Sequence, residues 1–115
     1  MFEVRIDTGR DGMVVVHAIG EVDMTVSALL ERTLVDAALR AAPGQVVVDF
    51  ENLRFLDSSG VHALVRGYHA VNDAGGSLTV RNASGVVARV LYITGVAEAL
   101  GMPALDETDE YPKGA

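Results

Sequence analysis

The residues best suited to do chemistry are Asp57-Ser58-Ser59-Gly60, which we name the serine loop. Two hydroxyl groups stand here beside one carboxylate, between an apolar stretch and a helical pattern. A serine hydroxyl can accept a phosphoryl group, which adds about 1.5 to 2 negative charges at neutral pH. A helix start tolerates added negative charge, because its first backbone N–H groups are unpaired. The loop could therefore switch binding without unfolding the protein.

The serine loop also has a simpler interpretation as a helix start. Aspartate and serine are among the commonest residues at this position. Either Ser58 or Ser59 is expected to be the N-cap, with its hydroxyl accepting from backbone N–H groups of the first turn. A cap on a tight loop is also exposed, so capping and phosphorylation both remain open.

Two further carboxylates, Glu21 and Asp23, belong to Gly20-Glu21-Val22-Asp23, which we name the acidic segment. Taken singly, each is expected to serve a turn or a helix cap. If the preceding strands are paired, the acidic segment would lie close to Asp57 and form an acidic rim for a partner. The two roles are compatible.

Common enzyme motifs are absent from the sequence. It contains neither a G-x-x-x-x-G-K-[ST] phosphate loop nor a G-x-G-x-x-G fingerprint. His17, His62 and His69 show no spacing typical of metal ligands. A hydrolytic triad using Asp57 and Ser58 would also need an orienting histidine. We therefore predict no enzyme activity, no catalytic residue, no metal site and no cofactor.

Length and charge narrow the possible partners. The chain has 115 residues, half of them hydrophobic, which predicts one domain with its own core. The formal charge of −7 argues against nucleic acid or an anionic membrane surface as a direct partner. There is no cysteine, no secretory signal pattern and no apolar run near the roughly 20 residues of a membrane span. A cytoplasmic location is expected.

Apolar periodicity predicts the elements before the serine loop. Alternation over residues 2–6, turn chemistry over 8–12 and an apolar run over 13–19 predict a hairpin. A helix capped by Thr25 should follow and end before Pro43. Residues 45–50 predict a strand inside the domain. The helix that ends before Pro43 is expected to face inward with Leu29, Leu30, Leu34, Ala37, Ala38 and Leu39.

After the strand, a connection ending in Phe55-Leu56 leads to the serine loop and a second helix. Gly75-Gly76 should end that helix, residues 77–81 form a strand, and Ser84-Gly85 open a third helix. We predict an α/β domain around a mixed sheet. The second helix has an apolar face with spacings of 3, 4, 7 and 10 residues at Val61, Leu64, Val65, Tyr68 and Val71. The third has an inward side expected to consist of Val86, Val87, Val90 and Leu91.

In this order, the features resemble the STAS family, specifically the stand-alone bacterial anti-sigma factor antagonists. The acidic segment is similar to the family's G-E-L-D, and the serine loop with Val61 is similar to its D-S-S-G-L. Gly75-Gly76 stands where the family has two glycines before a strand, and residues 90–95 are similar to its V-L-x-x-T-G. The resemblance runs from the first hairpin to about Met102 and implies a small mixed sheet with helices packed mainly on one face.

The resemblance also implies a role in partner switching. The unphosphorylated protein would bind an anti-sigma factor that is a serine kinase with a histidine-kinase-like ATPase fold, and so release a sigma factor. Phosphorylation at Ser58 would abolish binding, and a metal-dependent serine phosphatase would reset the switch. The implied partner-binding residues are Gly20, Glu21, Asp23, Asp57, Ser59, Gly60 and Val61.

Two departures and two alternatives accompany this resemblance. His62 stands where the family often has a small residue, so it could tune partner choice or be surface variation. Met24 and Val26 follow Asp23 where polar residues are frequent, which predicts a more apolar contact surface there. A STAS accessory or scaffold subunit of a transporter or signalling complex is the main alternative, and a small-molecule or nucleotide-binding module is another. We assign residues 1–105 to the domain and residues 106–115 to an acidic, flexible tail.

Overall fold

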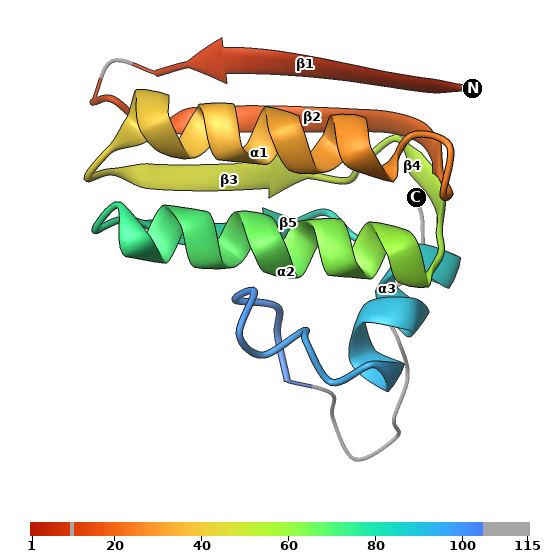
Figure 1. Cartoon of the computed structure of the whole chain (residues 1–115). Helices are drawn as coiled ribbons and strands as arrows, with labels where there is room; N and C mark the ends of the chain where they lie inside the picture. The colour runs from red at the N-terminus through yellow and green to blue at the C-terminus, as the bar shows by residue number, and fades with distance from the viewer. Residues whose placement is uncertain (10, 105–115) are drawn as a thin grey trace.

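The sheet is organised around strand β2 (Val14–Val22) in the computed structural model, which describes residues 1–9 and 11–104. β2 pairs antiparallel with β1 (Phe2–Thr8) and parallel with β3 (Gln45–Asp49). β5 (Ser77–Arg81) pairs parallel with β3, so the strand order is β1-β2-β3-β5 (Figure 1). This mixed five-stranded sheet confirms the predicted α/β fold. The predicted tail lies outside the described residues.

The fifth strand, β4 (Leu53–Leu56), extends the line of β3 alongside β2. The first half of β2 aligns with β3, whereas Gly20–Val22 align with β4. The pairing shifts register between Gly20 and Glu21. The prediction of a mere connection here was wrong, because a four-residue strand with buried ends and an exposed middle shows no period-2 alternation.

Helices α1 (Ser27–Ala41) and α2 (Ser58–Asp73) lie side by side over one face of the sheet (Figure 1). α3 (Gly85–Ile93) contacts β4 at one end of the molecule. This arrangement confirms helices packed mainly on one face. The core lies between the sheet and the helices, where the fully buried side chains include Val14, Val16, Leu30, Leu34, Val46, Val48, Phe50, Leu56 and Leu64.

Details of the helices differ from the sequence predictions. Thr25 is not the cap of α1, which begins after Val26 without a side-chain capping bond. The Thr25 hydroxyl instead donates to the Asp23 carboxylate, and the backbone oxygen of Asp23 accepts from Ser27 N. The buried faces of α1 and α3 are narrower than the apolar patterns predicted. Three residues expected to face inward are exposed: Leu29, Leu39 and Val86.

A polar network occupies the sheet face away from α1 and α2. His17 and Asp49 are cross-strand partners, and His17 Nδ1 lies 3.4 Å from Asp49 Oδ2. Burial raises the pKa of Asp49, but hydrogen bonds from Glu51 N–H and the Asn82 amide, with the Arg81 charge, together lower that pKa below its usual value. Arg81 Nη2 lies 3.3 Å from the same carboxylate. His17 is half-buried within this network.

Candidate functional site

The serine loop and the acidic segment lie together because β2 and β4 run parallel and end at the same edge. Val22 is paired with Leu56, and Asp57 N–H donates to Val22 O over 3.1 Å. Both chain segments leave the sheet here and enter α1 and α2 respectively. The structure thus brings together two groups of site residues that are more than thirty positions apart in the sequence.

Asp57, and neither serine, is the N-cap of α2. Its Oδ1 accepts from Ser59 N at 2.9 Å and from Gly60 N at 3.2 Å. The Ser59 hydroxyl donates to the same oxygen at 2.5 Å. The prediction of a serine cap was wrong, because the longer aspartate side chain reaches two unpaired N–H groups at once and adds a negative charge at the positive end of the helix.

The two serines differ in exposure and in hydrogen bonding. Ser59 is half-buried, and its hydroxyl is engaged by Asp57. Ser58, the first residue of α2, is exposed. Its hydroxyl has no hydrogen-bond partner among residues 1–9 and 11–104. Of the two serines, Ser58 alone combines exposure with an uncommitted hydroxyl within the described chain.

Asp23 repeats the local geometry of Asp57 at the end of β2. Its Oδ1 accepts from the Thr25 hydroxyl at 2.5 Å and from Thr25 N at 2.9 Å. These bonds, the hydroxyl's first and then the backbone N–H's, lower the pKa of Asp23 below its usual value. Asp23 is exposed and therefore presents a carboxylate that stays ionised near the serine loop.

Three of the predicted partner-binding residues are buried. A Cβ on Gly20, at φ +102°, would come within 2.1 Å of Met1 O, and a Cβ on Gly60 would come within 2.3 Å of Leu56 Cδ1. Val61 is also part of the core. These residues shape the two segments, whereas the side chains on the surface are those of Glu21, Asp23, Ser58 and, in part, Asp57 and Ser59.

Two features of this edge were not predicted from the sequence. Phe55, the cross-strand neighbour of Glu21, is a large apolar side chain that is 43% exposed. The amino group of Met1 lies 3.3 Å from Glu21 Oε1, and Met1 O accepts from Glu21 N at 3.0 Å. No local sequence signal could have revealed this contact, because it depends on the pairing of β1 with β2.

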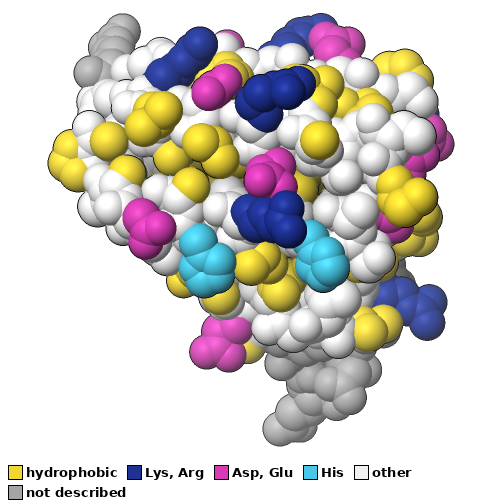
Figure 2. Space-filling view, viewed as in Figure 1, with side chains coloured by type: hydrophobic (Ala, Val, Ile, Leu, Met, Phe, Trp, Pro, Cys, Tyr) yellow, Lys and Arg dark blue, Asp and Glu magenta, His cyan; other side chains and the backbone are white. Residues whose placement is uncertain are grey.

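A groove of about 190 Å³ runs between the first turns of α1 and α2. Arg66 Nη1 and Glu31 Oε1 join the two helices across it at 3.0 Å. On the helix-covered face, histidine, acidic and basic side chains are interspersed with apolar ones, and no single kind dominates (Figure 2). The groove is lined by Ser27, Ala28, Glu31, Ser59, His62, Ala63 and Arg66.

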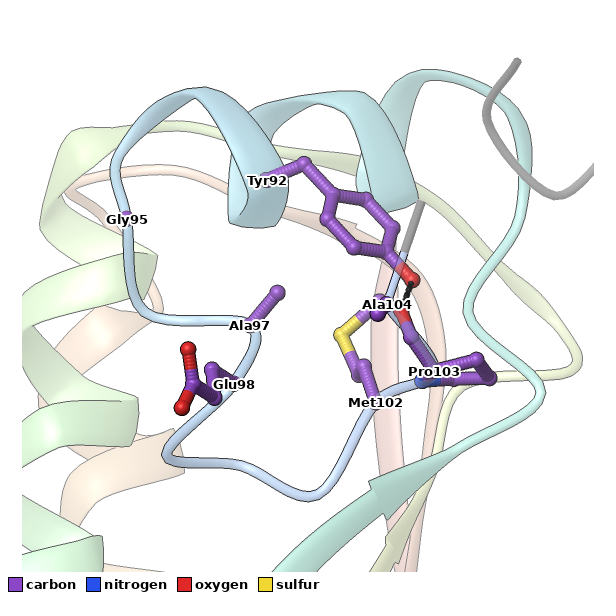
Figure 3. Close-up of a pocket in the computed structure, with 7 residues that line it drawn as sticks. All are labelled: Tyr92, Gly95, Ala97, Glu98, Met102, Pro103 and Ala104. Carbon is purple, nitrogen blue, oxygen red and sulfur yellow. Dashed lines mark hydrogen bonds between the residues drawn. The ribbon is translucent and has the colours of Figure 1, made fainter. Parts of the chain in front are cut away.

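A second hollow, of about 580 Å³, is lined by Tyr92 of α3 and by residues of the segment that follows α3, including Glu98 and Met102. There the Tyr92 hydroxyl reaches the backbone oxygen of Pro103 (Figure 3). None of the predicted site residues lines this hollow. Among the described residues, no cluster of three potential metal ligands is found, and no helix is long and apolar enough to span a membrane.

Comparison with known proteins identifies the family of this chain. The family model for the STAS domain matches residues 6–109. The chain belongs to the STAS domain family. Two curated STAS relatives are the anti-sigma F factor antagonist of Paenibacillus polymyxa, 30% identical over 83% of this chain and 80% of that protein, and the anti-sigma-B factor antagonist of Bacillus subtilis (strain 168), 28% identical over 80% and 83%.

Solved STAS structures share the fold. The anti-sigma factor antagonist SpoIIAA in its unphosphorylated form has a TM-score of 0.71 at 23% identity, over 93% of this chain and 91% of that one. An anti-sigma factor antagonist from Mycobacterium paratuberculosis has a TM-score of 0.72 at 24% identity, over 93% and 90%. SpoIIAA in its phosphorylated form has a TM-score of 0.64 at 22% identity, over 93% and 95%.

Proposed function

We propose that this STAS domain is an anti-sigma factor antagonist whose unphosphorylated form binds an anti-sigma factor and releases a sigma factor. Two curated relatives that align with most of the chain are named as anti-sigma factor antagonists, which supports the proposal. The observation that carries the proposal is the exposed Ser58 hydroxyl, held at the start of α2 beside the acidic segment. Phosphorylation of Ser58 is the step that ends binding.

The geometry favours Ser58 over Ser59 as the phosphorylated residue. A kinase must bring the hydroxyl oxygen in line with a phosphate, which requires an accessible side chain. To be phosphorylated, Ser59 would have to give up its bond to Asp57 Oδ1 and turn out of a half-buried position. Ser58 needs neither change, and capping by Asp57 keeps α2 in place while Ser58 reacts.

The charge around Ser58 explains how one phosphate could end binding. Asp57 stands next to Ser58, and the exposed carboxylates of Glu21 and Asp23 belong to the neighbouring segment. A phosphate would add about 1.5 to 2 negative charges to this acidic edge. A partner surface shaped for the unmodified edge would have to bury an unpaired charge, at a cost of about 3 kcal/mol, or more than a hundredfold in affinity.

The protein needs to supply only the hydroxyl and its rigid frame. A serine kinase brings the nucleotide, the metal and the base of phosphoryl transfer with it. We therefore extend the proposal to a partner that is both anti-sigma factor and kinase, with a histidine-kinase-like ATPase fold. A metal-dependent serine phosphatase would restore the unmodified state.

Partner capture from the host tests this proposal. The wild type, Ser58→Ala, Ser58→Glu and the matched control Ser59→Ala would be immobilised through their C-terminal ends. We expect an ATPase to be retained by the wild type, Ser58→Ala and Ser59→Ala, and to be lost by Ser58→Glu. The retained ATPase should phosphorylate the wild type and Ser59→Ala but not Ser58→Ala. Capture of transporter subunits, or of the same partners by all four proteins, would replace the proposal with the accessory or scaffold role.

A further inference from the structure

His62 lies one helical turn after Ser58 on α2, at the spacing where side chains share a helix face. Cβ atoms four positions apart on a helix are about 5 to 6 Å from each other. Helical side chains also lean toward the N-terminus, which carries the His62 ring toward the turn that contains Ser58. His62 also lines the groove that contains Ser59 and Ser27 of α1, whereas Ser58 is not part of that lining.

The charged groups around His62 come from both helices. Glu31 of α1 lines the same groove, but its carboxylate is paired with Arg66 of α2 at 3.0 Å. Asp57 is held at the helix start by three bonds to Oδ1. His62 is exposed and stands one turn after Ser58, whereas Arg66 stands two turns after it and is engaged by Glu31.

We propose that His62 pairs with the phosphate on Ser58 and positions it in the phosphorylated form of this protein. This inference rests on the proposed function only in taking Ser58 as the phosphorylated residue. An imidazole N–H donates to a phosphate oxygen, and an imidazolium adds a positive charge to that bond. The pairing offsets the repulsion between the phosphate and Asp57.

The pairing should shift the pKa of the phosphate in a predictable direction. A neighbouring cation favours the more highly charged form of the phosphate, so it lowers the pKa of the second phosphate ionisation, which is ordinarily about 6. Histidine becomes cationic in the same range of pH, so the phosphate should be held more strongly below neutrality than above it. A phosphatase must separate the phosphate from His62 before it can act, so the rate of dephosphorylation should depend on pH.

The test uses protein in which phosphoserine is incorporated at position 58 during translation, so that no kinase is required. Phosphorus NMR would follow the phosphate titration in the wild type, His62→Gln, His62→Lys and the control His69→Gln. His69 is also exposed on α2 but lies eleven residues from Ser58. Thermal unfolding of the four unmodified proteins would confirm that each one folds.

We expect the titration midpoint of His62→Gln to lie higher than that of the wild type by about 0.3 pH unit, the size of an exposed pair one turn apart. His62→Lys should keep a midpoint at or below that of the wild type, and His69→Gln should match the wild type. Equal midpoints for wild type and His62→Gln, or an equal shift in His69→Gln, would overturn the pairing. Failure of the capture experiment would overturn the proposed function instead.

Discussion

Asp57 combines two tasks at the level of the single residue, because it caps α2 and immobilises Ser59 through the same oxygen. Its removal leaves two backbone N–H groups and one hydroxyl without their acceptor. Asp57→Ala should therefore lower the free energy of unfolding by about 1 to 2 kcal/mol.

Urea denaturation of Asp57→Ala measures this cost. Asn caps helices about as well as Asp, so Asp57→Asn should stay within about 0.5 kcal/mol of the wild type. Ser58→Ala should do the same, because it removes a hydroxyl that makes no bond within the described chain. An unfolding curve of Asp57→Ala that matched the wild type would contradict the capping assignment.

Asp49 makes stability depend on pH at acid values. Its folded pKa is lowered, so its stabilisation is complete above the unfolded value of about 3.9 and is lost as the pH falls through the lower folded pKa. Asp49→Asn should cost about 2 kcal/mol at pH 7 and progressively less below about pH 4. Chemical denaturation across this range, with the exposed Asp36→Asn as the control, would refute the assignment if the Asp49→Asn difference stayed constant.

At the level of elements, the contact of α1 with α2 requires a glycine. A Cβ on Gly67 would lie 2.7 Å from both Cβ and Cδ1 of the fully buried Leu34. Gly67→Ala gains about 1 kcal/mol of helix propensity but loses about 1 to 3 kcal/mol to overpacking. We expect a lower melting temperature, measured by circular dichroism.

A double-mutant cycle separates the two effects. A Leu34→Ala background removes the clash with Cδ1 and leaves only the one with Cβ, which the smaller side chain lets the helices relieve, so Gly67→Ala should cost less there than in the wild type. If Gly67→Ala were equally harmful in both backgrounds, the close approach of the helices would not be its cause.

The sequence allowed prediction of the elements with clear periodicity and missed those without it. The hairpin, the three helices and the strands at residues 45–50 and 77–81 follow from local patterns. β4 shows no such pattern and exists because β2 offers it a pairing partner. Motifs identified the serine loop and the acidic segment, but their adjacency follows from the β2–β4 pairing, which is non-local. The sequence could not show that Ser59 is bound to Asp57 while Ser58 is not, because this depends on the direction of the Asp57 side chain.

For the whole molecule, the central position of β2 predicts cooperative unfolding. β2 pairs with three strands and contributes core residues against both covering helices. Loss of any one layer would expose this shared core, so no part should unfold alone. Calorimetry should show one transition, with equal calorimetric and van't Hoff enthalpies of about 70 kcal/mol. Two resolved transitions would contradict this picture.

The docking of Met1 against Glu21 has a practical consequence for anyone who labels this protein. Residues added before Met1 would emerge beside the acidic segment and replace the amino group that now contacts Glu21. An N-terminal fluorescent protein or purification handle would therefore stand over the edge where Ser58 is exposed, and could mimic a loss-of-binding variant. Reporter fusions at this terminus would measure the obstruction caused by the reporter together with the behaviour of the switch.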